Sequence, residues 1–311
     1  MVPAAAPLDE HIRRRPPDPL DAGPTCDDNQ RMDRLTQSWA LHWPDADIEA
    51  MADDVRQRAV SAADAWGLRH LNELPGGTVA LVLADEDVVL KVHPRGHPDD
   101  EQLIAEGVAL QAWSATGAAA QLYGRRDGGS TLLLERLTPG TPLEAAGVSW
   151  DERLEVLGTL VGRLHAALQP AVGSPHIGGT YSRDWRRTLG DSQLLSPAAD
   201  DVLLHSDLHG GNALRAGARW RIIDPHAVRG DRHADIWALI DPLAPVPPDA
   251  RTARTWIRRY AAAANLDSDR AAEWVHYRAR GEALDGADGD HAWAERLTHM
   301  ANLLGAADRP G

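Results

Sequence analysis

The sequence has no phenylalanine, one cysteine, one lysine and no apolar run long enough to cross a bilayer. Cys26 has no second cysteine with which to form an internal disulfide bond, which excludes a small, cross-linked secreted scaffold. The first residues lack the basic start and apolar stretch of a signal peptide. We therefore expect a cytoplasmic protein that has no membrane partner.

Basic residues are also few relative to acidic ones. The 311 residues include 32 Lys and Arg against 46 Asp and Glu, which gives a formal net charge of −14. A surface of this sign repels nucleic acid and favours cationic ligands, so no nucleic-acid partner is expected. No pattern indicates an obligate protein partner. The length predicts two domains, or one domain with two lobes.

The first third of the chain changes character twice. Residues 1–30 contain six prolines and no periodic apolar face, which predicts a disordered or loosely packed arm. Apolar residues at helical spacing from Met32 to Trp66, interrupted at Pro44, predict two short helices. Short apolar runs and turns then predict an antiparallel sheet with one helix, with strands near 79–83, 88–92, 119–123 and 131–137 and the helix at 99–113.

Residues 139–142 read Pro-Gly-Thr-Pro and predict a hinge. After it, helical patterns dominate, with helices expected at 150–168, 198–202, 234–240, 250–264, 270–284 and 292–304. The sequence therefore predicts an α+β protein with a small sheet-rich lobe at residues 31–138 and a larger helical lobe at 139–311.

Chemistry-bearing residues are densest between residues 202 and 224. An apolar run delivers Asp207 into a glycine-containing loop, Asn212 follows five residues later, and a second apolar run ends on Asp224. Two strands that end on acidic loops can bring three oxygen ligands to one point. Magnesium prefers such ligands and completes its shell with phosphate and water.

Three other interpretations of this segment exist. Each polar residue can simply cap a turn. His205 and His209 have the spacing of a helical metal-ligand pair, but Gly210-Gly211 argues against a helix, and no HExxH motif is present. Residues 206–210 also match the opening motif of metallophosphatases, yet neither the Asn-His nor the His-x-His ligands of that family follow.

Phosphoryl transfer explains more of the sequence. It needs a carboxylate for the attacking hydroxyl, oxygen ligands for magnesium and a cation on the nucleotide phosphates. His-x-Asp-x4-Asn with a later Asp has the order of kinase catalytic and metal loops. Lys91 lies in a predicted strand, and Glu106 lies on the next helix as its partner. The only lysine thus falls where a compact ammonium suits better than a planar guanidinium.

At this point a family resemblance is apparent. The chain resembles the aminoglycoside/hydroxyurea antibiotic-resistance kinases, and streptomycin 6-kinases most closely, over about residues 60–305. The segments that carry the resemblance are 66–68, 76–78, 89–94, 105–110, 132–137, 204–212, 223–225, 230–231 and Asp235. The resemblance implies a bilobal, protein-kinase-like fold with a small antiparallel-sheet N-lobe and a larger helical C-lobe. It also implies an ATP- and magnesium-dependent enzyme that phosphorylates a hydroxyl of an aminoglycoside-type antibiotic and so confers resistance.

The resemblance also implies residue roles. Asp207 is expected as the base for the substrate hydroxyl, and Asn212 and Asp224 as the magnesium ligands. Lys91 is expected to hold the nucleotide phosphates, with Glu106 holding Lys91.

Further roles follow from the same resemblance. Thr78 belongs to the expected phosphate loop, and backbone groups from Glu135 to Leu137 are expected to meet adenine. His205 and Asp235 are expected to position the catalytic loop.

The sequence departs from the family pattern in three places. Ser206 stands where these kinases often have glycine, and residues 76–78 form no GxGxxG loop. His226 and residues 232–234 also differ from the commoner sequences, so the particular drug stays open.

The acidic balance suits a cationic antibiotic beside the nucleotide. Asp207 and Asp231 are expected to contact the substrate, although any such acid can also be an ordinary surface residue. The further candidates are Asp241, Glu273, Glu282, Asp285, Asp288 and Asp290. A kinase for another small metabolite alcohol is one alternative. A catalytically silent kinase-like binding protein is another, but its hallmark would be loss of Lys91, Asp207 or Asp224, and all three are present.

Overall fold

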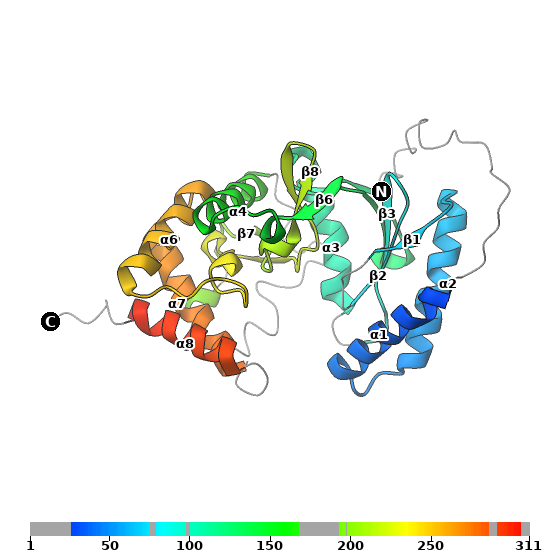
Figure 1. Cartoon of the computed structure of the whole chain (residues 1–311), viewed down its shortest axis with the longest axis horizontal. Coiled ribbons are helices and arrows are strands. Elements are labelled where there is room, and N and C mark those ends of the chain that lie inside the picture. The colour runs from blue at the N-terminus through cyan, green and yellow to red at the C-terminus, as the bar shows by residue number, and fades with distance from the viewer. Residues whose placement is uncertain are drawn as a thin grey trace. The chain divides into compact units, whose positions relative to one another are not determined.

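In the computed structural model the chain divides into two units (Figure 1). The first comprises Met1–Gly107 and Ala120–Arg136, and the second Val108–Ala119 and Leu137–Gly311. The structure describes residues 26–74, 79–97, 100–167, 193–196, 198–285 and 291–305. Thr78, Asp288 and Asp290, which the sequence singled out, lie outside these ranges.

The first unit is built on a five-stranded antiparallel sheet with the order β1-β2-β3-β5-β4. Its strands are β1 (Asn72–Glu73), β2 (Leu81–Ala84), β3 (Val88–Val92), β4 (Leu122–Arg126) and β5 (Thr131–Glu135). Strand β3 is central, and its register sets Lys91 opposite Val82 on one side and Leu132 on the other.

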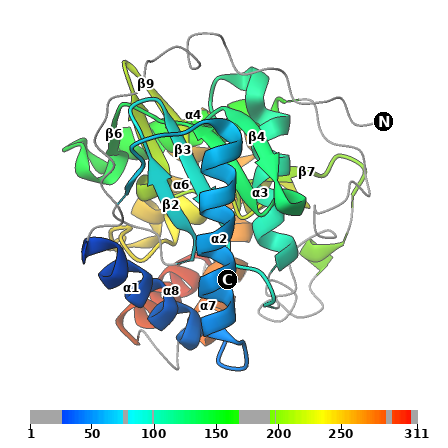
Figure 2. The ribbon, with the colours of Figure 1, turned by 90° about the vertical axis from the view of Figure 1, so that its right-hand side faces the viewer.

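Two helices cover one face of this sheet, α1 (Cys26–His42) and α2 (Ile48–Trp66), as Figure 2 shows for α2 in front of β2 and β3. Helix α2 begins after Asp47, whose carboxylate accepts the Ala50 amide hydrogen at 3.1 Å, and ends at Gly67 in a left-handed conformation (φ 68°). The apolar faces of both helices pack against alternate residues of β3, including Leu90 and Val92.

The two helices expected between Met32 and Trp66 are thus confirmed, although α1 begins at Cys26, within the segment expected to be an arm. The helix expected at 99–113 is α3 (Asp100–Trp113). The strand expected at 119–123 lies later, as β4, because it pairs with β5 from Leu122 onward.

The described part of the second unit contains four helices, which gather on one side, and two small sheets (Figure 1). The helices are α4 (Trp150–His165), α6 (Ala250–Ala264), α7 (Ser268–Asp285) and α8 (His291–Gly305). One sheet pairs β7 (Val202–Leu204) with β10 (Val228–Gly230), and the other has the order β6-β8-β9, with β6 (Pro139–Pro142), β8 (Ala213–Ala216) and β9 (Arg219–Ile222). The four helices confirm the expected helical C-terminal part and, with the antiparallel sheet, the α+β class.

Two local expectations for this unit are wrong. No helix forms at 198–202, because the Asp201 carboxylate closes a turn on the Ala198 amide at 3.0 Å and Val202 already pairs in β7. Residues 234–240 form short 3₁₀ turns instead of an α-helix. Residues 139–142, expected as a hinge, form strand β6, which pairs with β8 and follows closely after the boundary between the two units at Arg136 and Leu137.

Helices α4 and α6 approach each other closely at two glycines. A Cβ atom added to Gly158 would lie 2.6 Å from the Tyr260 carbonyl oxygen, and one added to Gly162 would lie 3.0 Å from that of Ala264.

Among the described helices, none is long and apolar enough to cross a membrane.

Candidate active site

Lys91 in the first unit forms a buried ion pair. Its Nζ lies 2.7 Å from Oε2 of Glu106 on α3, and the side chains are 9% and 2% exposed. The same oxygen lies 2.8 Å from Nε2 of His93. An ionised carboxylate only accepts hydrogen bonds, so Nε2 carries the hydrogen and donates it. The structure therefore brings together the predicted pair and adds a third side chain to it.

The residues expected near adenine lie at the end of β5. The Glu135 amide donates to the Gln121 carbonyl at 2.9 Å, and the Glu135 carboxylate accepts from the Gln121 amide at 3.2 Å. Leu137 is buried. These bonds order the end of β5, and an adenine-binding role for its backbone stays a prediction.

In the second unit, β7 leads directly into the loop that carries Asp207. The Asn212 side-chain amide donates to the Asp207 main-chain oxygen at 3.0 Å and to Oδ2 at 3.2 Å. Both bonds use the amide nitrogen, so the Asn212 amide oxygen is the atom suited to a metal ion. The five-residue spacing thus closes a turn that places the two side chains side by side.

Asp224 is joined to this loop through its neighbour. The Ile223 amide donates to the Asn212 carbonyl at 3.0 Å, and His205 Nε2 donates to the Ile223 carbonyl at 3.0 Å. The main chain on the N-terminal side of Asp224 is therefore held by two residues of the 205–212 loop. Asp224 itself has a left-handed conformation (φ 58°).

Asp235 lies against the start of the same loop. Its Oδ2 accepts the His205 amide at 3.0 Å and its Oδ1 accepts the Ser206 amide at 2.8 Å. His165 Nε2 lies 3.1 Å from Oδ2, and the Tyr260 hydroxyl donates to the Asp235 carbonyl at 2.6 Å. Burial opposes ionisation of this carboxyl, but the hydrogen bond and charge of His165 and the loop amide outweigh it, so the pKa of Asp235 is lowered.

Ser206 adopts a left-handed backbone conformation (φ 61°), which favours glycine. Three contacts hold it there: Asp235 binds its amide, Arg278 Nη1 donates to its carbonyl at 3.3 Å, and its hydroxyl donates to the His226 carbonyl. The hydroxyl thus compensates for a backbone conformation that disfavours side chains. It also ties the Asp207 loop to the segment after Asp224.

The carboxylate of Asp231 already accepts hydrogen bonds from residues of its own unit. Its Oδ1 accepts the His233 amide at 2.9 Å and the His233 ring at 2.6 Å. Its Oδ2 accepts Arg270 Nε at 2.9 Å and Trp274 Nε1 at 2.8 Å. Burial opposes ionisation, yet the bonds from His233, Trp274 and Arg270 hold its pKa well below the usual range. This pattern favours a structural role, so we leave Asp231 out of the proposed substrate site.

In contrast to Asp231, Asp241 has a raised pKa, to which burial and other carboxylates, including that of Asp207, contribute. Burial first, and then the charges of Glu144 and Asp207, raise the pKa of Asp241. His209 Nδ1 lies 4.0 Å from Asp241, but it already accepts the Gly211 amide at 3.1 Å and so has no hydrogen to donate. Within the described residues, no arginine or lysine forms a salt bridge with Asp241. We call Glu144, Asp207 and Asp241 the acidic group.

No group of three or more His, Cys, Asp or Glu residues in the described part of the chain forms a metal site. Magnesium, however, is usually bound by only one or two carboxylates together with phosphates and water. Asp224 and the Asn212 amide oxygen supply the oxygen donors that such an ion requires. The donor set therefore fits magnesium rather than a metal that prefers nitrogen or sulfur.

Three of the residues described above had no role assigned from the sequence. Glu144 lies far from the 205–212 loop in the chain and reaches it because Gly210 lets the two segments approach, with 3.0 Å from an added Cβ to Glu144 Cβ. Arg278 gave no signal, since its helix shows only ordinary amphipathic spacing. His93 offered one signal, its position two residues after Lys91, which puts both side chains on the same face of a strand.

A sequence profile of the aminoglycoside/hydroxyurea antibiotic resistance kinases matches residues 76–288. The chain belongs to this family. Among curated proteins, none matches the chain. Membership in this kinase family confirms the resemblance expected from the sequence and supports a small-molecule phosphotransferase.

Solved structures agree with the family on the fold. A choline/ethanolamine kinase family protein from Mesorhizobium loti is 16% identical, with 84% of this chain and 96% of that chain covered and a TM-score of 0.52. The choline kinase LicA from Streptococcus pneumoniae is 11% identical, with 81% and 98% covered and a TM-score of 0.54. The streptomycin–ATP complex of APH(2")-IIa also matches, at 12% identity, 80% and 97% coverage and a TM-score of 0.47. This chain thus has the expected protein-kinase-like fold.

Proposed function

We propose that this protein transfers the terminal phosphoryl group of ATP to a hydroxyl of a cationic, streptomycin-like aminoglycoside in the cytoplasm, and so confers resistance. The observation that carries the proposal is the contact of Asn212 with Asp207, in a loop that also holds the main chain beside Asp224. It joins a carboxylate base to oxygen donors for a metal, as phosphoryl transfer needs.

Each of these groups has a task in the proposed reaction. Asp207 orients the attacking hydroxyl and accepts its proton as the phosphoryl group is transferred. Asn212 and Asp224 would hold magnesium, which would supply positive charge to neutralise the phosphates. His205, Ser206 and Asp235 keep these side chains in place through main-chain hydrogen bonds.

Nucleotide binding is assigned to groups of the sheet-containing unit. Lys91 binds the phosphates as a compact cation, and Glu106 holds the ammonium in place. Thr78 contributes to the phosphate loop, and backbone groups between Glu135 and Leu137 meet adenine. These last assignments come from the family resemblance.

The acidic group supports a cationic acceptor. Burial, and after it the charges of Glu144 and Asp207, raise the pKa of Asp241, so a cation bound beside it would favour its ionised form. Amino or guanidino groups of an aminoglycoside have the required charge. The net charge of −14 adds a long-range attraction for the same ligands.

A panel of acceptors tests the proposal. ADP release is measured with streptomycin, other aminoglycosides, choline, ethanolamine and a neutral sugar, and the phosphorylated hydroxyl of each product is mapped by ³¹P and ¹H NMR. We expect the highest kcat/KM with an aminoglycoside, and this value should fall as ionic strength rises. No transfer by the parent protein, or salt-independent rates on a neutral acceptor, would contradict the proposal.

Choline is the second candidate, because the acidic group suits a quaternary ammonium as well as an amino sugar. Both candidates use the same base and metal ligands. A kcat/KM for choline above that of every aminoglycoside would favour the metabolite kinase. ATP binding without any transfer would favour a kinase-like binding protein.

A further inference from the structure

Helix α2 precedes the part of the chain that the family profile matches, yet one of its side chains reaches the central strands of the sheet. Arg58 is only 6% exposed although it is charged. A buried guanidinium requires a paired charge and acceptors for its five N–H groups. The contacts that meet this requirement lead to the nucleotide-binding lysine.

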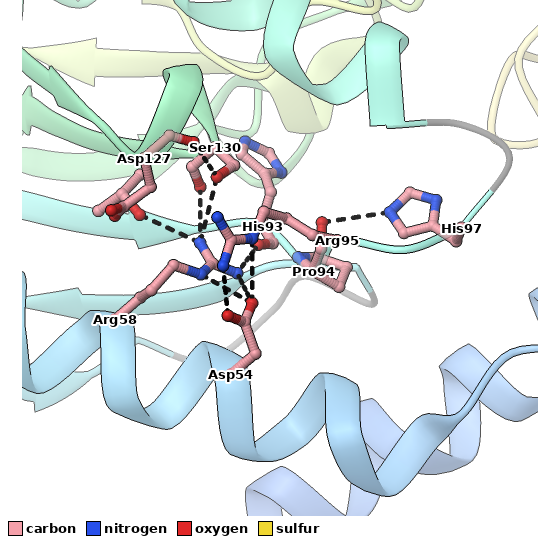
Figure 3. A network of polar contacts seen from close by, with 9 residues as sticks. Asp54, Arg58, His93, Pro94, Arg95, His97, Asp127 and Ser130 are labelled. Carbon is pink, nitrogen blue, oxygen red and sulfur yellow. Dashed lines mark hydrogen bonds and ion pairs between the residues drawn. The ribbon is translucent and has the colours of Figure 1, made fainter.

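The guanidinium of Arg58 binds three segments at once (Figure 3). Nε donates to Asp54 at 2.8 Å, Nη1 to the Thr131 hydroxyl at 3.1 Å, and Nη2 to the His93 carbonyl at 2.6 Å. Nη1 also lies 3.3 Å from the Ser130 hydroxyl. Arg58 therefore connects α2 with the end of β3 and the start of β5.

Asp54 supplies the paired charge. Burial opposes its ionisation, but hydrogen bonds from Arg95 and Arg58 outweigh that effect, so the pKa of Asp54 is lowered. The carboxylate is thus charged at neutral pH and fixes the plane of the Arg58 guanidinium. Arg95 follows His93 by two residues, so Asp54 holds the same segment from a second point.

His93 is consequently held at both of its main-chain polar groups. Its amide donates to the Ser130 carbonyl at 2.8 Å, and its carbonyl accepts from Arg58. The ladder between β3 and β5 is thereby extended by one residue. This fixed backbone sets where the imidazole points.

The imidazole shares its acceptor with Lys91. Both donors reach the same Glu106 oxygen, at 2.8 Å from His93 Nε2 and 2.7 Å from Lys91 Nζ. Residues two apart on a strand face the same side, so β3 presents both donors to α3 together. His93 is 1% exposed and Glu106 2%, so water does not compete for these bonds.

We propose that Arg58 and His93 are positioning residues for nucleotide binding: Arg58 fixes the His93 backbone from α2, and the His93 ring fixes Glu106, which holds Lys91. This inference rests on the proposed function, because it assigns to Lys91 the nucleotide phosphates. It goes further in giving α2, outside the family match, a part in the activity.

The His93 step is tested by two substitutions. His93→Leu removes the donor to Glu106, whereas His93→Gln supplies an amide N–H close to the position of Nε2. Loss of a hydrogen bond to a charged group corresponds to about a 10- to 100-fold weaker interaction. We expect His93→Leu to raise the KM for ATP by about that factor. His93→Gln should restore most of the affinity, and the KM for the acceptor should stay unchanged.

The Arg58 step uses a matched pair on one helix. Arg58→Met keeps the length of the side chain but removes the bond to the His93 carbonyl, and Arg58→Lys retains a single cation for the case in which Arg58→Met does not fold. Arg56→Met is the control, since Arg56 pairs only with the exposed Asp53 among the described residues. We expect a raised KM for ATP in both Arg58 variants and an unchanged one in the control.

Calorimetric titration with Mg·ATP and thermal unfolding without nucleotide accompany the kinetics. Variants that unfold earlier but bind ATP like the parent would overturn the inference, because a purely structural role predicts that result. Equal ATP affinity of His93→Leu and His93→Gln would also overturn it. If the parent itself binds no ATP, the proposed function fails, which is a separate outcome.

Discussion

The side-chain amide of Asn212 donates two hydrogen bonds to Asp207, one to its main-chain oxygen at 3.0 Å and one to Oδ2 at 3.2 Å. One carboxylate oxygen is thereby oriented by the protein, and the other stays available for the acceptor hydroxyl. The same contact turns the amide oxygen of Asn212 away from Asp207 and leaves it available for its proposed role as a metal ligand.

Asp207→Asn should therefore lose most of kcat while the acceptor still binds. The substituted amide keeps the shape and can still accept from Asn212, but it cannot take the hydroxyl proton. General-base contributions set the expected loss at roughly 10²–10⁴-fold. Steady-state rates of the variant measure the loss of kcat, and calorimetric titration with acceptor measures whether binding is retained. Turnover like that of the parent would exclude Asp207 as the base.

Asp224→Ala should remove nearly all turnover without unfolding the protein, because its half-buried carboxylate is the proposed acidic ligand of the metal. Loss of metal-based charge stabilisation predicts a decrease of roughly 10²–10³-fold. Rates are measured over a magnesium titration, with Glu295→Ala, an exposed acid on α8, as the control. Recovery of the parent rate at saturating magnesium would refute the ligand assignment.

Lys91→Arg should lower kcat/KM for ATP by about tenfold or more. The Lys91 ammonium shares one Glu106 oxygen with His93 in a buried space. The larger, planar guanidinium of an arginine cannot take the same position. The chain has no second lysine, so the control is the reverse exchange at the surface, Arg56→Lys. An unchanged kcat/KM would mean that the phosphates bind elsewhere.

His205 predicts a pH dependence of stability. Burial lowers its pKa below 6.5, so between the lowered value and 6.5 the unfolded chain binds a proton that the folded chain does not. Stability therefore rises with pH across this window, by at most about 1.4 kcal/mol per pH unit, and is complete above it.

His205→Gln should flatten that slope, since glutamine does not titrate and its amide can still donate to the Ile223 carbonyl. Urea unfolding at several pH values between 5 and 8 measures the difference between the two proteins. The lowered pKa of Asp235 acts in a more acidic range and does not interfere. Identical slopes would show that His205 does not stay neutral on folding.

Gly158→Ala should destabilise the protein by about 1–3 kcal/mol, the usual cost of overpacking. The added methyl would lie 2.6 Å from the Tyr260 carbonyl oxygen on α6, so backbone must move. Thr159→Ala, at an exposed position of the same helix, is the control. Chemical denaturation of both variants makes the comparison, and equal stabilities would contradict the close approach of α4 and α6.

Much of the fold could be predicted because the local hydrophobic patterns agree with the way the elements pack in the folded protein. The helical periodicity of residues 250–264 predicted α6 to the residue, since its apolar face is also its packing face. Prediction failed at 234–240, where the Asp235 carboxylate is drawn to the amides of residues 205 and 206. That interaction spans about thirty positions, and no local pattern contains it.

The sequence by itself determined which groups are available for chemistry: Asp207, Asn212, Asp224 and the single lysine, at spacings that a loop or strand can bring together. Tertiary structure alone decided which carboxylates have their hydrogen-bonding capacity satisfied within the protein and which do not. Asp231 receives four hydrogen bonds that keep its pKa low, whereas burial and then the charges of Glu144 and Asp207 raise the pKa of Asp241. The physical reason is that the state of a carboxylate depends on burial and on donors and charges brought to it by distant segments, and only the folded chain sets these.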